Sequence, residues 1–131
     1  MKYLVTGGAG FIGSHFIELL IENNHEVICM DNLSTGYKSN LNSVIQKIDF
    51  YEEKIELFEF NKVSNVDAIV HLAAQPSVQL SITNFSYSSS SNLLGAIKVI
   101  DYCRLNEIPL IYASSSAVYG NLEFGNDEIK S

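Results

Sequence analysis

The feature that most constrains this chain is a glycine-rich segment, residues 6–13, directly after a short apolar run at residues 3–5. An apolar run that stops at glycines is typical of a buried strand. The hydrophobic period then becomes helical after Phe11. The apolar residues expected on one helical face are Ile12, Phe16, Leu19 and Leu20. The sequence therefore predicts a strand, a tight glycine turn and a helix in immediate succession.

The rest of the chain continues this alternation. Further strands are expected at residues 26–30, 48–51, 67–72 and 109–113. Residues 32–42 are polar and predict a loop, and Leu93, Ile97 and Ile100 repeat at helical spacing. The serine-rich residues 86–91 are short and lead into that pattern, so we interpret them as the polar start of a helix rather than a linker. Alternating strands and helices predict one α/β domain, residues 1–131, with a Rossmann-like doubly wound parallel sheet of about five strands.

The composition limits which classes of partner the protein can bind and where in the cell it is expected. The net charge of −7 disfavours nucleic acid and anionic membranes as partners. No run approaches membrane-spanning length and no signal peptide is evident, so a cytoplasmic location is expected. Cys29 and Cys103 lie in apolar runs, which predicts buried free thiols rather than a disulfide or a metal site.

The glycine segment has the spacing of a phosphate-binding turn. Gly7 permits the tight turn, Gly10 lets a pyrophosphate approach the main chain, and Gly13 lets the helix pack on the strand. Asp31 ends the second strand about 20 residues later, where an acid binds ribose hydroxyls and repels a 2′-phosphate. This favours NAD over NADP. The alternatives are a purely structural glycine turn and a turn-capping role for Asp31.

With these residues in view, the chain resembles the extended short-chain dehydrogenase/reductase (NAD-dependent epimerase/dehydratase) family. Within it, the chain most resembles the amino-terminal part of UDP-sugar 4-epimerases, from residue 1 to about residue 120. Motifs in family order carry the resemblance: residues 6–15, 31–36, 71–75, 92–95 and 114–120.

The resemblance implies roles for particular residues. The implied NAD contacts, besides the three glycines, are Phe11, Ile12, Asp31, Asn32, Ser34, Ile55, Leu72, Ala73, Ala74 and Gln75. Ser115 takes the catalytic hydroxyl position, where it would hydrogen-bond the sugar O4; the alternative is a strand-end serine that satisfies main-chain groups. His71 is expected to be structural, and Tyr119 is not the proton-transferring tyrosine.

The chain also departs from the family pattern. Lys54 stands where the family has an aspartate that binds the adenine amino group, and Phe85 stands where a proline is usual. The family's Tyr-x-x-x-Lys pair, in which the lysine lowers the tyrosine pKa so that it accepts the sugar proton, follows beyond Ser131. The substrate-binding lobe follows as well. We therefore expect this chain to be inactive alone.

Two other functions stay open. A sugar-nucleotide dehydratase or decarboxylase would carry an acid just after the catalytic hydroxyl, whereas Ser116 and Ala117 follow here. A non-catalytic NAD-binding module is the second alternative. The expected partners are a UDP-sugar in a full-length enzyme and a second copy of the chain. This copy would bind through the helix after the fourth strand, which is apolar over much of its surface.

Overall fold

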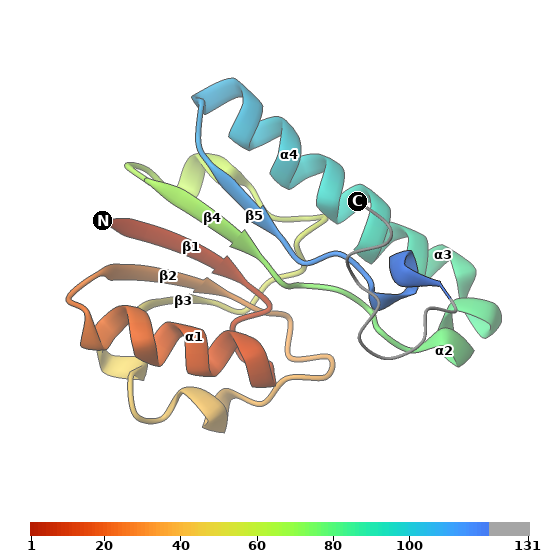
Figure 1. Cartoon of the computed structure of the whole chain (residues 1–131), viewed down its shortest axis with the longest axis horizontal. Helices are drawn as coiled ribbons and strands as arrows, with labels where there is room; N and C mark the ends of the chain where they lie inside the picture. Colours follow the sequence, from red (N-terminus) through yellow and green to blue (C-terminus); the bar gives the residue numbers. More distant parts are fainter. Residues whose placement is uncertain (121–131) are drawn as a thin grey trace.

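The computed structural model describes residues 1–120. Five strands form one sheet in the order β3-β2-β1-β4-β5, and all neighbours run parallel (Figure 1). The strands are β1 (Lys2–Thr6), β2 (Glu26–Met30), β3 (Asp49–Tyr51), β4 (Ala68–His71) and β5 (Leu110–Tyr112). Each lies within one residue or so of a predicted strand. The predicted fold class is confirmed.

The helices cover both faces of this sheet. They are α1 (Phe11–Glu22), α2 (Val78–Thr83), α3 (Phe85–Ser89) and α4 (Gly95–Asn106). A π-helical turn, Ser90–Leu94, joins α3 to α4. Helices α1 and α4 lie on opposite sides of the sheet (Figure 1). The serine-rich segment is itself helical, so it is not a linker, and α2 was not predicted.

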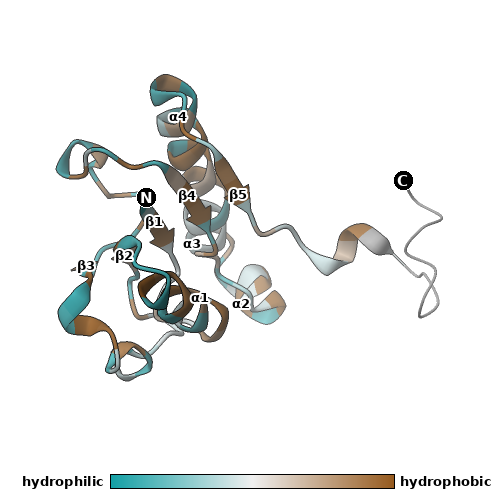
Figure 2. Ribbon diagram, turned by 60° about the vertical axis from the view of Figure 1, so that its left-hand side comes forward, coloured by the Kyte–Doolittle hydropathy of each residue, from teal (hydrophilic) through white to brown (hydrophobic). Residues whose placement is uncertain are grey.

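The two faces of the sheet bury separate cores because neighbouring strand residues point to opposite sides. Leu4 packs with Val99 of α4 and with Phe58, whereas Val5 packs with Ile17 of α1 and with Leu41. Strands β1 and β4 carry hydrophobic residues in their middle parts, drawn brown in Figure 2. Continuous apolar strands are expected where both faces of a parallel sheet are covered.

The buried face of helix α1 matches the predicted one only in part: Leu20 is buried and Phe16 packs against the core, as expected. Its buried residues include Gly13, Ile17 and Leu20, at spacings of four and three residues. Ile12 and Leu19 were expected in the core but are 68% and 53% exposed. Ile12 is in the first turn, at the end of the strands, where it lines a cleft rather than the core. The buried stripe therefore includes Leu20 and Phe16 but not Ile12 and Leu19.

Helix α4 is apolar on more than one side, as its sequence indicates. Ala96, Val99 and Cys103 are buried against the sheet. The exposed large apolar side chains on and just before this helix are Leu93 (63%), Leu94 (47%), Ile97 (52%), Ile100 (49%) and Leu105 (64%). Beside them, β5 forms an edge of the sheet. Nothing in residues 1–120 covers this outer face.

Both cysteines are free and buried, as predicted, and they lie in different cores. Within the described part of the chain, no helix has the length and apolar character needed to cross a membrane.

Candidate functional site

A cleft of about 370 Å³ opens at the carboxyl ends of the central strands. Gly7 follows β1, Asp31 follows β2 and Leu72 follows β4, and all three line it. Strand β1 pairs with β2 on one side and with β4 on the other, so the strand order reverses here. Ligands of doubly wound folds bind at such a reversal.

The cleft gathers nearly all the predicted cofactor residues. Those that line it are Gly7, Gly10, Phe11, Ile12, Gly13, Asp31, Asn32, Ser34, Ile55, Leu72, Ala73 and Ala74. Residues that the sequence analysis missed are Met30, Thr35, Gly36, Glu53, Pro76, Ser91 and Ala113. Thr35 and Gly36 lie within the motif at residues 31–36 but were not predicted as contacts, and Met30 directly precedes that motif. Pro76, Ser91 and Ala113 likewise adjoin the motifs at residues 71–75, 92–95 and 114–120, whereas Glu53 adjoins none and carried no such signal.

The turn after β1 presents an open helix N-terminus to the cleft. Gly7 has a positive φ of 71°, and a Cβ there would lie 2.7 Å from the Ala73 nitrogen. Gly10 is the N-cap of α1 and supplies no side-chain hydrogen bond. The N–H groups of the first helical turn have no intrahelical partner. These groups and the helix dipole together make this end of the cleft suited to a phosphate.

Asp31 lies beside this turn and is already engaged by the main chain. Its Oδ2 accepts a hydrogen bond from the Ala9 nitrogen at 2.9 Å, and its Oδ1 accepts one from the Leu33 nitrogen at 2.8 Å. Asp31 therefore does cap the turn, which is the alternative role considered for it above. It does not exclude the ribose role, because a carboxylate accepts about four hydrogen bonds and two are used here.

The β4 side of the cleft rests on a buried polar pair. Thr6 Oγ1 lies 2.6 Å from His71 Nδ1, and the same oxygen accepts a hydrogen bond from the Ala73 nitrogen at 3.2 Å. His71 is 3% exposed, and this burial lowers its pKa. His71 is thus a buried, neutral histidine that supports the loop after β4 through Thr6. This agrees with the structural role expected for it.

Gln75 is the predicted cofactor residue that does not line the cleft. It is 7% exposed, and its side chain donates to the Ser77 carbonyl at 3.1 Å. The Asn92 side chain binds both main-chain groups of Gln75. Its Oδ1 accepts a hydrogen bond from the Gln75 nitrogen at 2.7 Å, and its Nδ2 donates one to the Gln75 carbonyl at 3.0 Å. The Gln75 side chain is thus turned into the protein. Asn92 anchors this loop on the helix.

Ser115 also lies outside the cleft. Its hydroxyl is exposed and accepts a hydrogen bond from the Ala117 nitrogen at 3.2 Å. This contact satisfies a main-chain group, which is the alternative that the sequence analysis left open. Ala113, on the same strand end, does line the cleft. The catalytic role of Ser115 stays a prediction.

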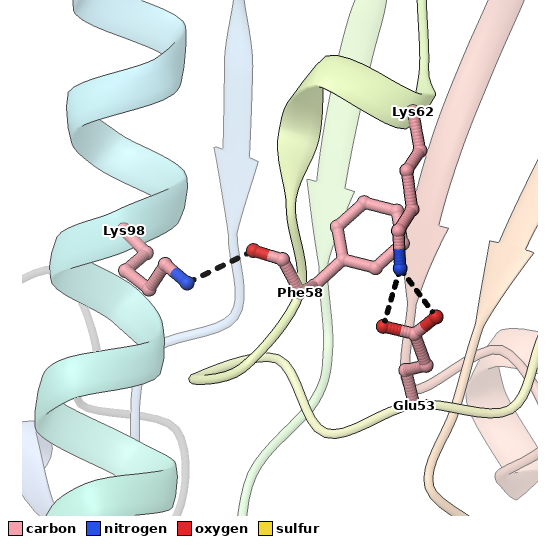
Figure 3. Close-up of polar contacts among 4 residues, drawn as sticks. All are labelled: Glu53, Phe58, Lys62 and Lys98. Carbon is pink, nitrogen blue, oxygen red and sulfur yellow. Dashed lines mark hydrogen bonds and ion pairs between the residues drawn. The ribbon is translucent and has the colours of Figure 1, made fainter.

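The wall beyond β3 is fixed by two lysines (Figure 3). Lys98 of α4 donates to the main-chain oxygen of Phe58 at 2.9 Å. Lys62 pairs with the Glu53 carboxylate at 2.8 Å, which raises the pKa of the lysine, and its ammonium lies 5.5 Å from the centre of the Phe58 ring. Glu53, held by Lys62, lines the cleft together with Ile55. Lys54 does not line it.

The fold and the cleft define a Rossmann-type nucleotide-binding domain. Residues 3–131 match the model of the NAD dependent epimerase/dehydratase family. The chain belongs to this family.

Several known proteins similar to the chain carry epimerase names, and others are a UDP-glucuronic acid decarboxylase of Danio rerio and a dTDP-glucose 4,6-dehydratase of Streptomyces venezuelae. A putative UDP-glucose 4-epimerase of Methanocaldococcus jannaschii is 43% identical over 119 residues, which is 89% of this chain and 39% of that protein. The UDP-glucose 4-epimerase of Thermotoga maritima, solved with UDP-glucose, is 37% identical with a TM-score of 0.82, and the match covers 94% of this chain and 41% of that one.

The UDP-glucose 4-epimerase of Thermus thermophilus, solved in complex with NAD, is 34% identical with a TM-score of 0.81; the match covers 95% of this chain and 41% of that one. The chain therefore spans about two fifths of the length of these relatives.

Proposed function

We propose that the cleft binds NAD and that this chain is the cofactor-binding part of a nucleotide-sugar 4-epimerase. The observation that carries the proposal is the uncapped N-terminus of α1 opening into a cleft that also contains the Asp31 carboxylate. One feature suits a pyrophosphate and the other suits the ribose hydroxyls of the adenosine half.

The residues present fit the two halves of the cofactor. The first-turn N–H groups of α1 would hold the pyrophosphate, and the free acceptor positions of Asp31 would hold the adenosine ribose. Ile55 and Met30 offer apolar walls on that side of the cleft. Leu72, Ala73 and Ala74 line the β4 side, where the nicotinamide end would lie. Bound NAD would supply a hydride acceptor and donor.

The charge at Asp31 favours NAD over NADP. The carboxylate is buried beside the glycine turn, and its two engaged oxygens fix its position. A 2′-phosphate on the adenosine ribose would meet this negative charge at close range. Removing the negative charge of Asp31 should therefore reduce the preference for NAD over NADP.

The proposed reaction of the whole enzyme is reversible oxidation at C4 of a UDP-sugar through a 4-keto sugar. It is supported by the family and by the UDP-glucose 4-epimerases among the similar proteins. In this reaction Ser115 would hydrogen-bond the sugar O4 once substrate is bound. The Tyr-x-x-x-Lys pair that moves the proton is not in this sequence. Losing a general base costs about a hundred- to ten-thousand-fold in rate, so the chain alone should not turn over UDP-glucose.

Titration of the purified chain with NADH, followed by the nicotinamide fluorescence, tests cofactor binding. The unaltered chain should bind NADH and discriminate against NADPH. Asp31→Asn keeps one acceptor oxygen for the main chain but removes the charge, so NADH should bind more weakly and NADPH should gain relative to it. A folded chain that binds no NADH at millimolar concentration would refute the proposal.

A non-catalytic NAD-binding module is the second candidate. Its support is the intact cofactor cleft together with a Ser115 hydroxyl that caps a turn outside that cleft. A reading frame that continues into Tyr-x-x-x-Lys would decide for the enzyme. Turnover of UDP-glucose or UDP-galactose by the 131-residue chain would contradict the expected inactivity. Dehydratase chemistry is disfavoured because Ser116 and Ala117 bring no carboxylate.

A further inference from the structure

Ala9, in the middle of the glycine turn, is held by hydrogen bonds on both sides. Its N–H donates to Asp31 Oδ2 at 2.9 Å. Its carbonyl accepts from the Tyr37 nitrogen at 3.1 Å and from the Asn40 side-chain nitrogen at 2.9 Å. All three partners come from the segment after β2. Ala9 is fully buried beneath this segment.

We call residues 31–41 the strap, because the segment crosses the glycine turn and is fixed at both ends. Asp31 fixes the first end through its two main-chain contacts. Leu41 fixes the second end, where it is fully buried in the core shared with Ile17 of α1. Between them Gly36 approaches so closely that a Cβ would lie 2.8 Å from the Ala9 carbonyl carbon.

The strap contacts the cleft and the glycine turn with different residues. Asn32, Ser34, Thr35 and Gly36 line the cleft, on the side proposed for the adenosine. Asn40 does not line it. As a whole, Asn40 is an exposed residue on the short helical turn Lys38–Leu41, yet its side chain reaches back to the Ala9 carbonyl. Neither core packing nor ligand contact accounts for this choice of residue.

The bond to Ala9 bears directly on the helix N-terminus. The Ala9 carbonyl and the Gly10 nitrogen belong to one rigid peptide plane. That nitrogen donates to the Gly7 carbonyl at 3.2 Å, and the Gly10 carbonyl accepts the first bond of the helix from the Ser14 nitrogen at 3.0 Å. A fixed Ala9 carbonyl therefore fixes the orientation of the Ala9–Gly10 peptide. This peptide directly precedes the first turn of α1, which carries the free N–H groups.

We propose that Asn40 is a positioning residue for the pyrophosphate end of the cleft. It acts through the Ala9–Gly10 peptide and never touches the ligand. The strap would then couple the two halves of the site, because the segment that lines the adenosine side also orients the turn that binds the phosphates. This inference rests on the proposed NAD function.

Asn40→Asp is the sharpest test because it keeps the shape of the side chain but removes the N–H donor. Asn42→Asp is the matched control. Asn42 is an exposed residue two positions away, and this substitution adds the same negative charge at a side chain that does not contact Ala9. Losing the hydrogen bond and placing a carboxylate against a carbonyl should weaken NADH binding about tenfold in Asn40→Asp. Asn42→Asp should stay within about twofold of the unaltered chain, since an exposed charge is screened.

Adenosine, which has no phosphate, separates positioning from a general structural effect. Its affinity, followed by NMR shifts, should be the same in both variants. Equal NADH affinities for the two variants would overturn the proposal. So would an Asn40→Asp variant that loses NADH and adenosine affinity to the same degree.

Amide hydrogen exchange of the ligand-free protein keeps the inference testable without NADH. The Ala9 and Gly10 amides should exchange faster in Asn40→Asp than in Asn42→Asp, at equal thermal stability. If the unaltered chain failed to bind NADH, the proposed function would fail, and this exchange would still decide whether Asn40 holds the turn. Unchanged exchange would show that it does not.

Discussion

Thr6 Oγ1 and His71 Nδ1 lie 2.6 Å apart in the interior beneath the β4 side of the cleft. The Thr6 oxygen also accepts the Ala73 N–H, so its own hydrogen is free to point at His71. The imidazole ring lies 5.4 Å from the ring of Tyr112 on β5. This arrangement suits a neutral histidine, and it connects strands β1, β4 and β5 through Thr6, His71 and Tyr112.

Protonation of His71 should therefore oppose folding. Burial lowers its pKa below the ordinary value of 6.5, so the unfolded chain takes up the proton first as pH falls. The His71 contribution to the free energy of unfolding is present above pH 6.5 and is lost as pH falls below that value. Urea unfolding between pH 7 and pH 5 should show this decline, and His71→Gln should reduce it.

An NMR titration of the His71 ring in the unaltered protein provides an independent check, even if His71→Gln folds poorly. A folded-state pKa at or above 6.5 would contradict the prediction.

Gly8 and Gly10 should respond differently to alanine. A Cβ at Gly8 would collide with the Cys29 sulfur and lie 2.7 Å from Ile17 Cδ1, whereas a Cβ at Gly10 would meet only the Gly7 oxygen at 3.2 Å. Gly8→Ala should therefore cost about 1–3 kcal/mol of stability through overpacking. Gly10→Ala should fold normally and bind NADH weakly, because its methyl group enters the cleft. Urea unfolding and NADH titration of both variants would separate the effects, and equal stability losses would refute the distinction.

The Cys29 thiol should report on global unfolding. Burial, followed by the charge of Asp31, raises the pKa of Cys29 to about 12. Only about one thiol in ten thousand is then ionised at pH 8, and the thiolate is the reactive form. In Cys103→Ala, alkylation of Cys29 should be slow in buffer and should accelerate with urea in step with unfolding. Rapid alkylation of Cys29 in the native protein would contradict this prediction, because it would show that the core beneath α1 opens without global unfolding.

The outer face of α4 should cause self-association. Leu94 and Ile97 are about half exposed beside the edge strand β5. Exposed apolar patches next to an open edge favour contacts between chains. Light scattering over a concentration series should show species larger than the monomer. Ile97→Glu should shift the population toward monomer, whereas Leu19→Glu on α1, at a position 53% exposed, should not. A monodisperse unaltered monomer at high concentration would contradict this prediction.

The strands were predictable because each is a short apolar run between turn residues, and parallel strands need both faces apolar. Helix faces were harder to predict. Ile12 and Leu19 fit a helical period but belong to the cleft and the surface, because tertiary position decides which apolar residues are covered. Helix α2 was missed because Val78–Thr83 is short and mixes apolar residues with serine and threonine, a pattern without clear helical periodicity.

The glycine turn and Asp31 were found at their places because residue type and spacing determine that part of the site. The placement of Gln75 and the role of Asn40 were not predictable in this way. Both depend on hydrogen bonds between segments distant in sequence, such as Asn92 with Gln75 and Asn40 with Ala9. No local pattern encodes which loop residue reaches which main-chain atom.

The central place of β1 in the sheet also has a consequence for the order of events during synthesis. Tyr3 pairs with Val27 on one side but with Ala68 on the other. At about 5–20 residues per second, the ribosome makes the second partner on the order of seconds after the first. During that interval β1 emerges with one edge satisfied and the other bare. The nascent chain should be most vulnerable to mispairing, and most attractive to chaperones, before β4 leaves the exit tunnel.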